Sequence, residues 1–270
     1  MGPWIELSCA YTQAGDALVL RRRAECFEIR LNGWELMSNR SHHSEEIMAV
    51  LACERLACER LDGEAPRVLV GGLGMGYTLR AALDTLPGSA TAIVAELLPE
   101  VIAWNRGPLA SLAGRPLEDQ RVTVVCGDIS DLARTTNDRF DAIILDVDNG
   151  PDAVMLHGNR PLYERDGLRL LRQALKRSGT LAVWSADRST RFERNLRSAG
   201  FRWRGVDVPA RGIPGDPTHH VYLARIDDRI RQSRSHHDAV ACLPEPPRRD
   251  YRTASIVTPG SCVPAREGRR

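Results

Sequence analysis

The stretch Val68-Leu-Val-Gly-Gly-Leu-Gly-Met-Gly-Tyr-Thr-Leu-Arg80 passes from an apolar run, through a glycine-rich turn, into a helical segment. Glycines at such a junction let backbone N–H groups and the N-terminus of a helix approach a ligand closely. Gly72, Gly74 and Gly76 have the spacing Gly-x-Gly-x-Gly, whereas dinucleotide sites use Gly-x-Gly-x-x-Gly. The spacing present here is typical of sites for S-adenosyl ligands, which carry no pyrophosphate.

Outward from this turn, residues 66–226 alternate short apolar runs with helical stretches. The runs are residues 67–70, 90–95, 121–126, 140–145 and 179–184. They are nearly continuous and bounded by Gly, Pro or Asp, as expected of parallel strands buried on both faces. The alternation predicts an α/β fold with a Rossmann-like doubly wound sheet. Two later runs, 203–208 and 220–225, are separated by a Pro/Gly-rich stretch too short for a helix, so they predict a terminal antiparallel hairpin.

The flanking regions differ from this core. Residues 1–43 hold short β-forming stretches and the turn signal Asn32-Gly33, which predict a small N-terminal β appendage. A helix is predicted from Ser44, its cap, to about Asp62. We therefore expect an N-terminal β region at 1–43, a catalytic domain that binds the S-adenosyl ligand at 44–226, and a disordered Arg/Pro-rich tail at 227–270. The tail has too little apolar surface to offset the entropy of ordering.

Three acids follow successive predicted strands. Glu96 ends the second strand, Asp128 follows the third and Asp146 ends the fourth. The carboxyl ends of parallel strands meet at one edge of a sheet, which is where open α/β sheets bind ligands. A carboxylate at the second strand can accept hydrogen bonds from ribose hydroxyls. The sequence therefore predicts a nucleoside site at this edge.

The order and spacing of these motifs resemble those of the spermidine synthase family of aminopropyltransferases. The resemblance covers roughly residues 25–226 and includes Ala95-Glu96 with Val101-Ile102 and the pair Leu162-Tyr163. It implies the class I S-adenosylmethionine-dependent methyltransferase fold, with a small N-terminal β domain. It also implies decarboxylated S-adenosylmethionine as the aminopropyl donor and a small-molecule amine as the acceptor.

The resemblance assigns roles to residues of this chain. Gly72, Gly74 and Gly76 would line the cofactor turn, Glu96 would hold the ribose and Asp128 the adenine. Asp146 would face the reacting amine. Because a free alkylamine is protonated at neutral pH, a carboxylate must orient it and accept its proton. Asp146 is the candidate base, and Asp148 is the candidate second carboxylate.

The chain departs from the family pattern in three places. Met75 stands where the family's glycine turn has an aspartate, Asn149 stands where its fourth strand has a second acid, and Leu98 replaces the partner acid after Glu96. Two alternatives to aminopropyl transfer therefore stay open. One is an S-adenosylmethionine-dependent methyltransferase acting on a small molecule, which Met75 and Asn149 favour. The other is a protein that binds an S-adenosyl nucleoside without catalysis.

The composition excludes several other classes of protein. The apolar runs are far shorter than the ~18 residues that span a bilayer, and no secretory signal precedes them, so we expect a cytoplasmic protein without membrane contact. All basic residues except Lys176 are arginine, but residues 1–226 carry 28 basic and 29 acidic residues, which argues against nucleic acid. The scattered cysteines and adjacent histidines suggest no metal site. Edge strands in the N-terminal region could pair between subunits and form a homodimer.

Overall fold

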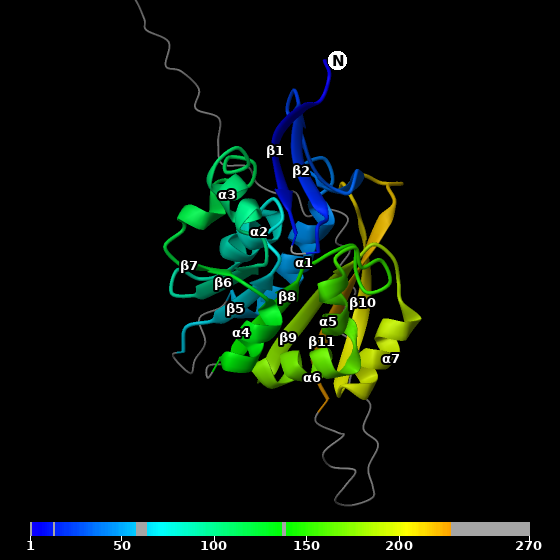
Figure 1. Ribbon diagram of the computed structural model, residues 1–270. Helices are drawn as coiled ribbons and strands as arrows, with labels where there is room; N and C mark the ends of the chain where they lie inside the picture. Colours follow the sequence, from blue (N-terminus) through cyan, green and yellow to red (C-terminus); the bar gives the residue numbers. More distant parts are fainter. Residues whose placement is uncertain (1, 13, 58–63, 137–138, 228–270) are drawn as a thin grey trace, which may run out of the picture. The chain divides into compact units, whose positions relative to one another are not determined.

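The computed structural model describes residues 2–12, 14–57, 64–136 and 139–227. They form two sheets, one of four strands near the N-terminus and one of seven strands with helices on both faces (Figure 1). The predicted disordered tail lies outside the described residues from position 228 onward. No helix in the described ranges is both long enough and apolar enough to cross a bilayer.

The seven-stranded sheet has the order β10-β11-β9-β8-β5-β6-β7. The strands β5 to β9 run parallel, and β11 and β10 close one edge as an antiparallel hairpin. The predicted Rossmann-like sheet with its terminal hairpin is therefore confirmed. The bounds of the strands are Arg67–Gly71 (β5), Thr91–Glu96 (β6), Val122–Cys126 (β7), Phe140–Leu145 (β8), Leu175–Ser185 (β9), Phe201–Pro209 (β10) and Thr218–Ile226 (β11).

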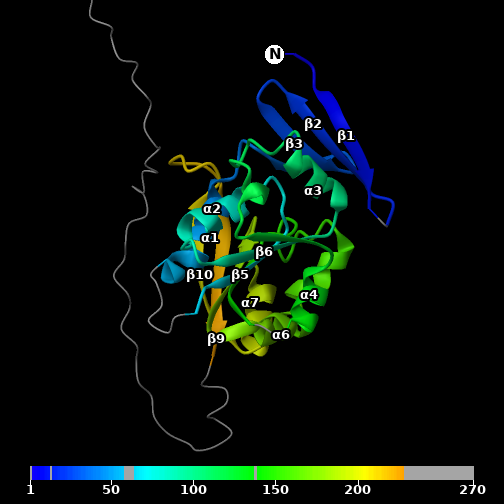
Figure 2. The ribbon, with the colours of Figure 1, turned by 90° about the vertical axis from the view of Figure 1, so that its left-hand side faces the viewer.

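Helices cover both faces of this sheet because its central strands are apolar on both sides. Every residue of β8 is buried, and burial of one Val, Leu, Ile or Phe side chain contributes roughly 1.5 to 3 kcal/mol. One face carries α1 (His43–Cys53), α2 (Tyr77–Thr85) and α3 (Pro99–Arg106), and their apolar side chains form one core cluster with the sheet. The other face carries α4 (Ile129–Thr135), α5 (Arg160–Tyr163), α6 (Arg165–Ala174) and α7 (Thr190–Ser198), which form the second cluster (Figure 2). Three short 3-10 turns are η1 (Glu54–Leu56), η2 (Pro116–Glu118) and η3 (His157–Asn159).

The N-terminal sheet is an antiparallel meander of β1 (Ile5–Tyr11), β2 (Ala17–Arg23), β3 (Cys26–Leu31) and β4 (Trp34–Ser38). Asn32 and Gly33 both have positive φ, of 50° and 84°, which matches the tight hairpin turn expected of this pair. Its inward side chains Leu18, Leu20 and Ile29 belong to the same apolar cluster as α1 and α2. The sheet is thus packed onto the larger domain, beside the glycine turn.

The first helix differs from its prediction at both ends. It begins at His43, and Ser44 does not cap it: the Ser44 hydroxyl accepts a hydrogen bond from Trp184 Nε1 at 3.0 Å and lies 2.8 Å from His219 Nδ1. Those partners lie 140 and 175 residues away, so no local pattern signals them. The helix ends at Cys53 and η1 follows, while the remainder of the predicted helix falls largely on residues 58–63, which are not described.

Candidate functional site

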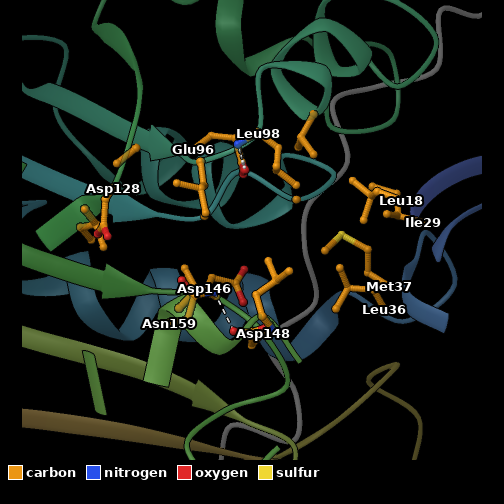
Figure 3. Close-up of a pocket in the computed structure, with 18 of the residues that line it drawn as sticks. Leu18, Ile29, Leu36, Met37, Glu96, Leu98, Asp128, Asp146, Asp148 and Asn159 are labelled. Carbon is orange, nitrogen blue, oxygen red and sulfur yellow. Dashed lines mark hydrogen bonds between the residues drawn. The ribbon is translucent and has the colours of Figure 1, made fainter. Parts of the chain in front are cut away.

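A pocket opens at the carboxyl ends of β5, β6 and β8, against the N-terminal sheet (Figure 3). It encloses about 700 Å³, counting the part that is open to solvent. One wall is acidic and the opposite wall is apolar. The acidic wall and its glycines come from the large sheet; the apolar wall consists of Leu18, Ile29, Leu36 and Met37.

The glycine turn lies between β5 and α2, and Gly72 and Gly74 line the pocket. Gly72 has φ +85°, and a Cβ there would lie 2.2 Å from the backbone oxygen of Asp146. A side chain at residue 72 is therefore excluded by the end of β8. Gly76, with φ +88°, precedes the first residue of α2 and allows the sharp entry into that helix. Unlike the other two glycines, Gly76 does not line the pocket.

Met75 does not face the pocket. Its side chain is buried in the core cluster that includes α1 and α2, and it does not line the pocket. The position at which the family carries an aspartate therefore supplies neither charge nor apolar surface to the pocket in this chain. Leu98, in contrast, does line the pocket, together with Leu97.

Glu96 holds the turn in place from the end of β6. Its Oε2 accepts a hydrogen bond from the backbone N–H of Leu73 at 2.9 Å, and its Oε1 accepts one from Leu98 at 2.9 Å. Burial raises the pKa of the Glu96 carboxyl, and these backbone donors oppose that rise. The carboxylate lines the pocket and has lone pairs left for a ligand hydroxyl.

Asp128 both caps a helix and lines the pocket. It is the N-cap of α4, where its Oδ1 accepts a hydrogen bond from the backbone N–H of Ser130 at 2.6 Å. It also lines the pocket, on the side away from the N-terminal sheet (Figure 3). Capping thus fixes the side chain while its second oxygen remains available to a ligand.

Asp146 follows the last residue of β8 and contacts α2. The hydroxyl of Thr78 donates a short hydrogen bond to its Oδ2. Burial raises the pKa of the Asp146 carboxyl to about 6, and the Thr78 hydrogen bond acts in the opposite direction. A carboxyl with a pKa near 6 is mostly ionised at neutral pH yet basic enough to take up a proton during a reaction.

Asp148 has a different environment, although it also lines the pocket. Its φ is +58°, and its carboxylate accepts hydrogen bonds from the backbone N–H groups of Leu156 at 2.9 Å and Met155 at 3.3 Å. The Asn159 side chain donates to its other oxygen at 2.6 Å (Figure 3). Asp148 therefore gathers the loop that runs from β8 to α5, and both of its oxygens are already engaged.

A further carboxylate lies close to Asp146, on the first turn of α1. Burial first, and then the charges of Asp146 and Glu46, raise the pKa of Glu45 well above its ordinary value. Burial, and then the charges of Glu45 and Glu46, raise the pKa of Tyr77 to about 12. The Tyr77 ring stacks on His42 with 3.8 Å between the ring centroids. The sequence pattern does not place Glu45 beside Asp146, because the fold that brings them together joins segments about a hundred residues apart.

A comparison with protein families adds the decisive observation. The model of the spermine/spermidine synthase domain matches residues 47–195, from within α1 to within α7. The chain belongs to the spermine/spermidine synthase family. Family membership implies a transferase. The matched range includes the glycine turn, Glu96, Asp128 and Asp146, whereas Glu45 and the apolar wall of the pocket lie before it.

Solved structures agree with this family at the level of the fold. A spermidine synthase in complex with the transition state analogue AdoDATO superposes with a TM-score of 0.62 at 18% identity, over 88% of this chain and 80% of that one. The spermidine synthase from Thermotoga maritima gives 0.63 at 17% identity over the same shares. Human methyltransferase-like protein 13, solved with SAH, gives 0.52 at 21% identity, over 70% and 83%. No curated protein sequence matches the chain.

Proposed function

We propose that the protein transfers the aminopropyl group of decarboxylated S-adenosylmethionine to a small amine, with Asp146 as the base. The observation that carries this proposal is the partly buried Asp146 carboxyl, with a pKa near 6, at the end of β8 in a pocket lined by the glycine turn. Support for the donor comes from the family and from the AdoDATO and SAH complexes of the structural relatives.

The reaction sets clear demands on such a site. The nitrogen of the acceptor attacks the carbon beside the sulfonium, the C–N bond forms as the C–S bond breaks, and the sulfur leaves as a neutral thioether. The amine must lose one proton, which Asp146 accepts. Holding the two reactants in line supplies up to about 7 to 11 kcal/mol of the barrier reduction in well-oriented reactions. Gly72, Gly74, Glu96 and Asp128 would hold the nucleoside for this purpose.

Glu45 and the apolar wall of the pocket have two further roles. The raised pKa of Glu45 favours its neutral form in the empty pocket, and an ammonium group bound near it and Asp146 would favour the ionised form, which would then orient that group. Leu18, Ile29 and Met37 exclude water from the opposite side, which strengthens the interaction between charges inside the pocket. Asp148 shapes the loop over the acceptor side and does not itself take the proton. The acceptor partner is then a small amine, with neither nucleic acid nor a metal ion in the reaction, and a homodimer is compatible with the exposed edges of the N-terminal sheet.

A second candidate, an S-adenosylmethionine-dependent methyltransferase, is favoured by one observation. The buried side chain of Met75 leaves the glycine turn without the carboxylate that would hold the amine of the decarboxylated donor. For aminopropyl transfer, the carboxyls of Glu45 and Asp146 must supply that charge. For methyl transfer, the donor keeps its own carboxylate and needs less negative charge around it.

Calorimetry with the two donors, followed by an assay for methylthioadenosine over a panel of amines, tests the proposal. Tighter binding of the decarboxylated donor and release of methylthioadenosine support aminopropyl transfer. Tighter binding of S-adenosylmethionine, with release of S-adenosylhomocysteine, would replace it with methyl transfer. Binding of a nucleoside with no turnover on any amine would leave the third alternative, a non-catalytic nucleoside-binding protein.

A further inference from the structure

A cluster of arginines lies on the α1 face of the large sheet, far along β11 from the nucleoside pocket. Arg202 on β10 pairs directly with Arg225 on β11, and Arg225 in turn pairs with Thr180 of β9, away from the carboxyl end of that strand at Ser185. Paired residues on neighbouring strands project to the same face. Arg204, two residues along β10, projects to that face as well. We call Arg55, Arg202, Arg204 and Arg225 the arginine cluster.

Arg55 joins the cluster from η1, the turn that follows α1. It lines an open depression with Arg202, Arg225, Arg177, Ser178 and Ile226. Burial lowers the pKa of the partly buried Arg225 guanidinium, and the positive charges of Arg55, Arg202 and Arg204 lower it further. Glu54 is the acid that opposes them. Three members of the cluster, Arg55, Arg202 and Arg225, thus line a concave surface, and Glu54 is the single acid among the groups that act on Arg225.

Several arginines elsewhere in the described part of the chain have acidic partners. Arg21 meets Glu28 at 2.6 Å, Arg121 meets Asp119 at 2.7 Å and Arg191 meets Glu164 at 3.1 Å. Within the residues that the structure describes, no member of the arginine cluster has a salt bridge or a side-chain hydrogen bond. Like charges directly opposite on neighbouring strands destabilise a sheet. The free protein therefore carries a local electrostatic cost on this face.

Protection of an exposed sheet edge explains only part of the cluster. Charged residues on an edge strand hinder pairing with another sheet, which accounts for Arg202 and Arg204 on β10. Arg225 lies on β11, which has a neighbour on each side, and Arg55 lies on no strand. Neither of them is placed to protect an edge. A multivalent anion bound in the depression accounts for Arg55, Arg202 and Arg225, which line it, because guanidinium groups bind phosphate oxygens in bidentate fashion.

We propose that the arginine cluster and the depression beside it form a binding site for a small polyphosphate anion, separate from the nucleoside pocket. The compact grouping of four arginines from three elements suits an anion with two or three adjacent phosphate groups. An extended strand of nucleic acid would instead need a basic stripe along the surface. The site does not depend on the reaction at Asp146.

Thermal unfolding and calorimetry on the full chain test this site, with sodium tripolyphosphate as the probe and sodium sulfate at equal ionic strength as the comparison. Saturable binding of tripolyphosphate, at least tenfold tighter than that of sulfate, is expected. Arg202→Gln and Arg225→Gln should each weaken it at least tenfold. Arg106→Gln, which removes the same charge from the exposed end of α3, should leave it unchanged.

The same variants report on the unliganded protein. Loss of one like charge from the cluster should raise the melting temperature of Arg202→Gln in the absence of ligand. Weak binding of tripolyphosphate by that variant would then not be a consequence of misfolding. Equal binding by wild type and both cluster variants would overturn the proposal, as would binding no tighter than that of sulfate. Affinity for single-stranded oligonucleotides that rises steadily with their length, with no saturable tripolyphosphate site, would overturn it in favour of a nucleic-acid surface.

Discussion

Thr78, on the first turn of α2, donates a hydrogen bond to the carboxylate of Asp146 at the end of β8. The helix that begins after the glycine turn therefore also holds the side chain of Asp146. A hydrogen bond to the ionised form favours ionisation and opposes the effect of burial. The pKa of Asp146 is therefore raised by burial, and α2 limits that rise through Thr78.

Removal of this hydrogen bond should shift the pH dependence of the reaction. In Thr78→Val the pKa of Asp146 should rise by about one unit, which corresponds to the loss of one hydrogen bond to a charged group. The acid limb of the plot of kcat/KM against pH should move to higher pH by that amount. Thr78→Ser keeps the hydroxyl and should keep the wild-type profile; a profile unchanged in Thr78→Val would remove this hydrogen bond from the control of Asp146.

Replacement of the candidate base should separate chemistry from binding. Asp146→Asn keeps the shape of the side chain but cannot accept the proton, so kcat should fall by at least about 100-fold. The affinity for methylthioadenosine, measured by calorimetry, should change by less than about threefold, because Glu96 and the glycine turn are intact. Undiminished turnover in Asp146→Asn would assign the base to another group.

Glu45 should act through charge. In Glu45→Gln the carboxyl that a bound ammonium group would ionise is lost, so the KM for the acceptor amine should rise by about tenfold. Glu46→Gln is the matched control, because Glu46 lies on the same turn but pairs with His42 at 3.0 Å. Identical effects of the two variants would show a general change of potential rather than a role for Glu45.

Glu96 should govern affinity for the nucleoside. Glu96→Ala removes the acceptor of the Leu73 and Leu98 backbone N–H groups along with any contact to a ribose. Binding of methylthioadenosine should weaken by at least about tenfold. Glu96→Gln retains one acceptor oxygen and should fall between the wild type and Glu96→Ala. Equal affinity in all three proteins would exclude Glu96 from the nucleoside site.

The stability of the ligand-free protein should carry a signature of Asp146. Its carboxyl has a pKa of about 6 in the folded protein and an ordinary value near 4 when unfolded. Between these values the folded state binds more protons, so the free energy of unfolding falls as pH rises from about 4 to about 6, by at most about 3 kcal/mol. Denaturant titrations of Asp146→Asn should show a smaller fall in the free energy of unfolding over this pH range. An equal fall would mean that a group other than Asp146 takes up the proton.

The sequence alone predicted the parts of the fold that depend on local apolar pattern. Continuous apolar runs such as 140–145 became buried parallel strands, and the glycine spacing marked the turn between β5 and α2. The same pattern could not place Ser44 against Trp184, because that contact depends on how α1 packs across the sheet. Nor could it show that the Met75 side chain turns into the core, since a turn of glycines leaves the direction of the intervening side chain open.

For the site, the sequence could predict which acids meet at one edge of the sheet but not the environment of each acid. The acids that end strands were brought to one edge because parallel strands leave them there, and Glu96, Asp128 and Asp146 all line one pocket. The sequence could not show that Asp146 and Asp148 have different hydrogen-bond partners, because the donors to Asp148 come from the loop that follows β8. The proximity of Glu45 to Asp146 could not be predicted for a similar reason, because it is set by the docking of a helix that the strand pattern does not describe.

Because residue 72 has no side chain, the glycine turn packs directly against the backbone of Asp146. The turn rests on the backbone oxygen of Asp146 with no room for even one methyl group between them. A displacement of the turn toward β8 would therefore displace the backbone of Asp146. A substitution at residue 72 would accordingly disturb both the glycine turn and the position of the candidate base.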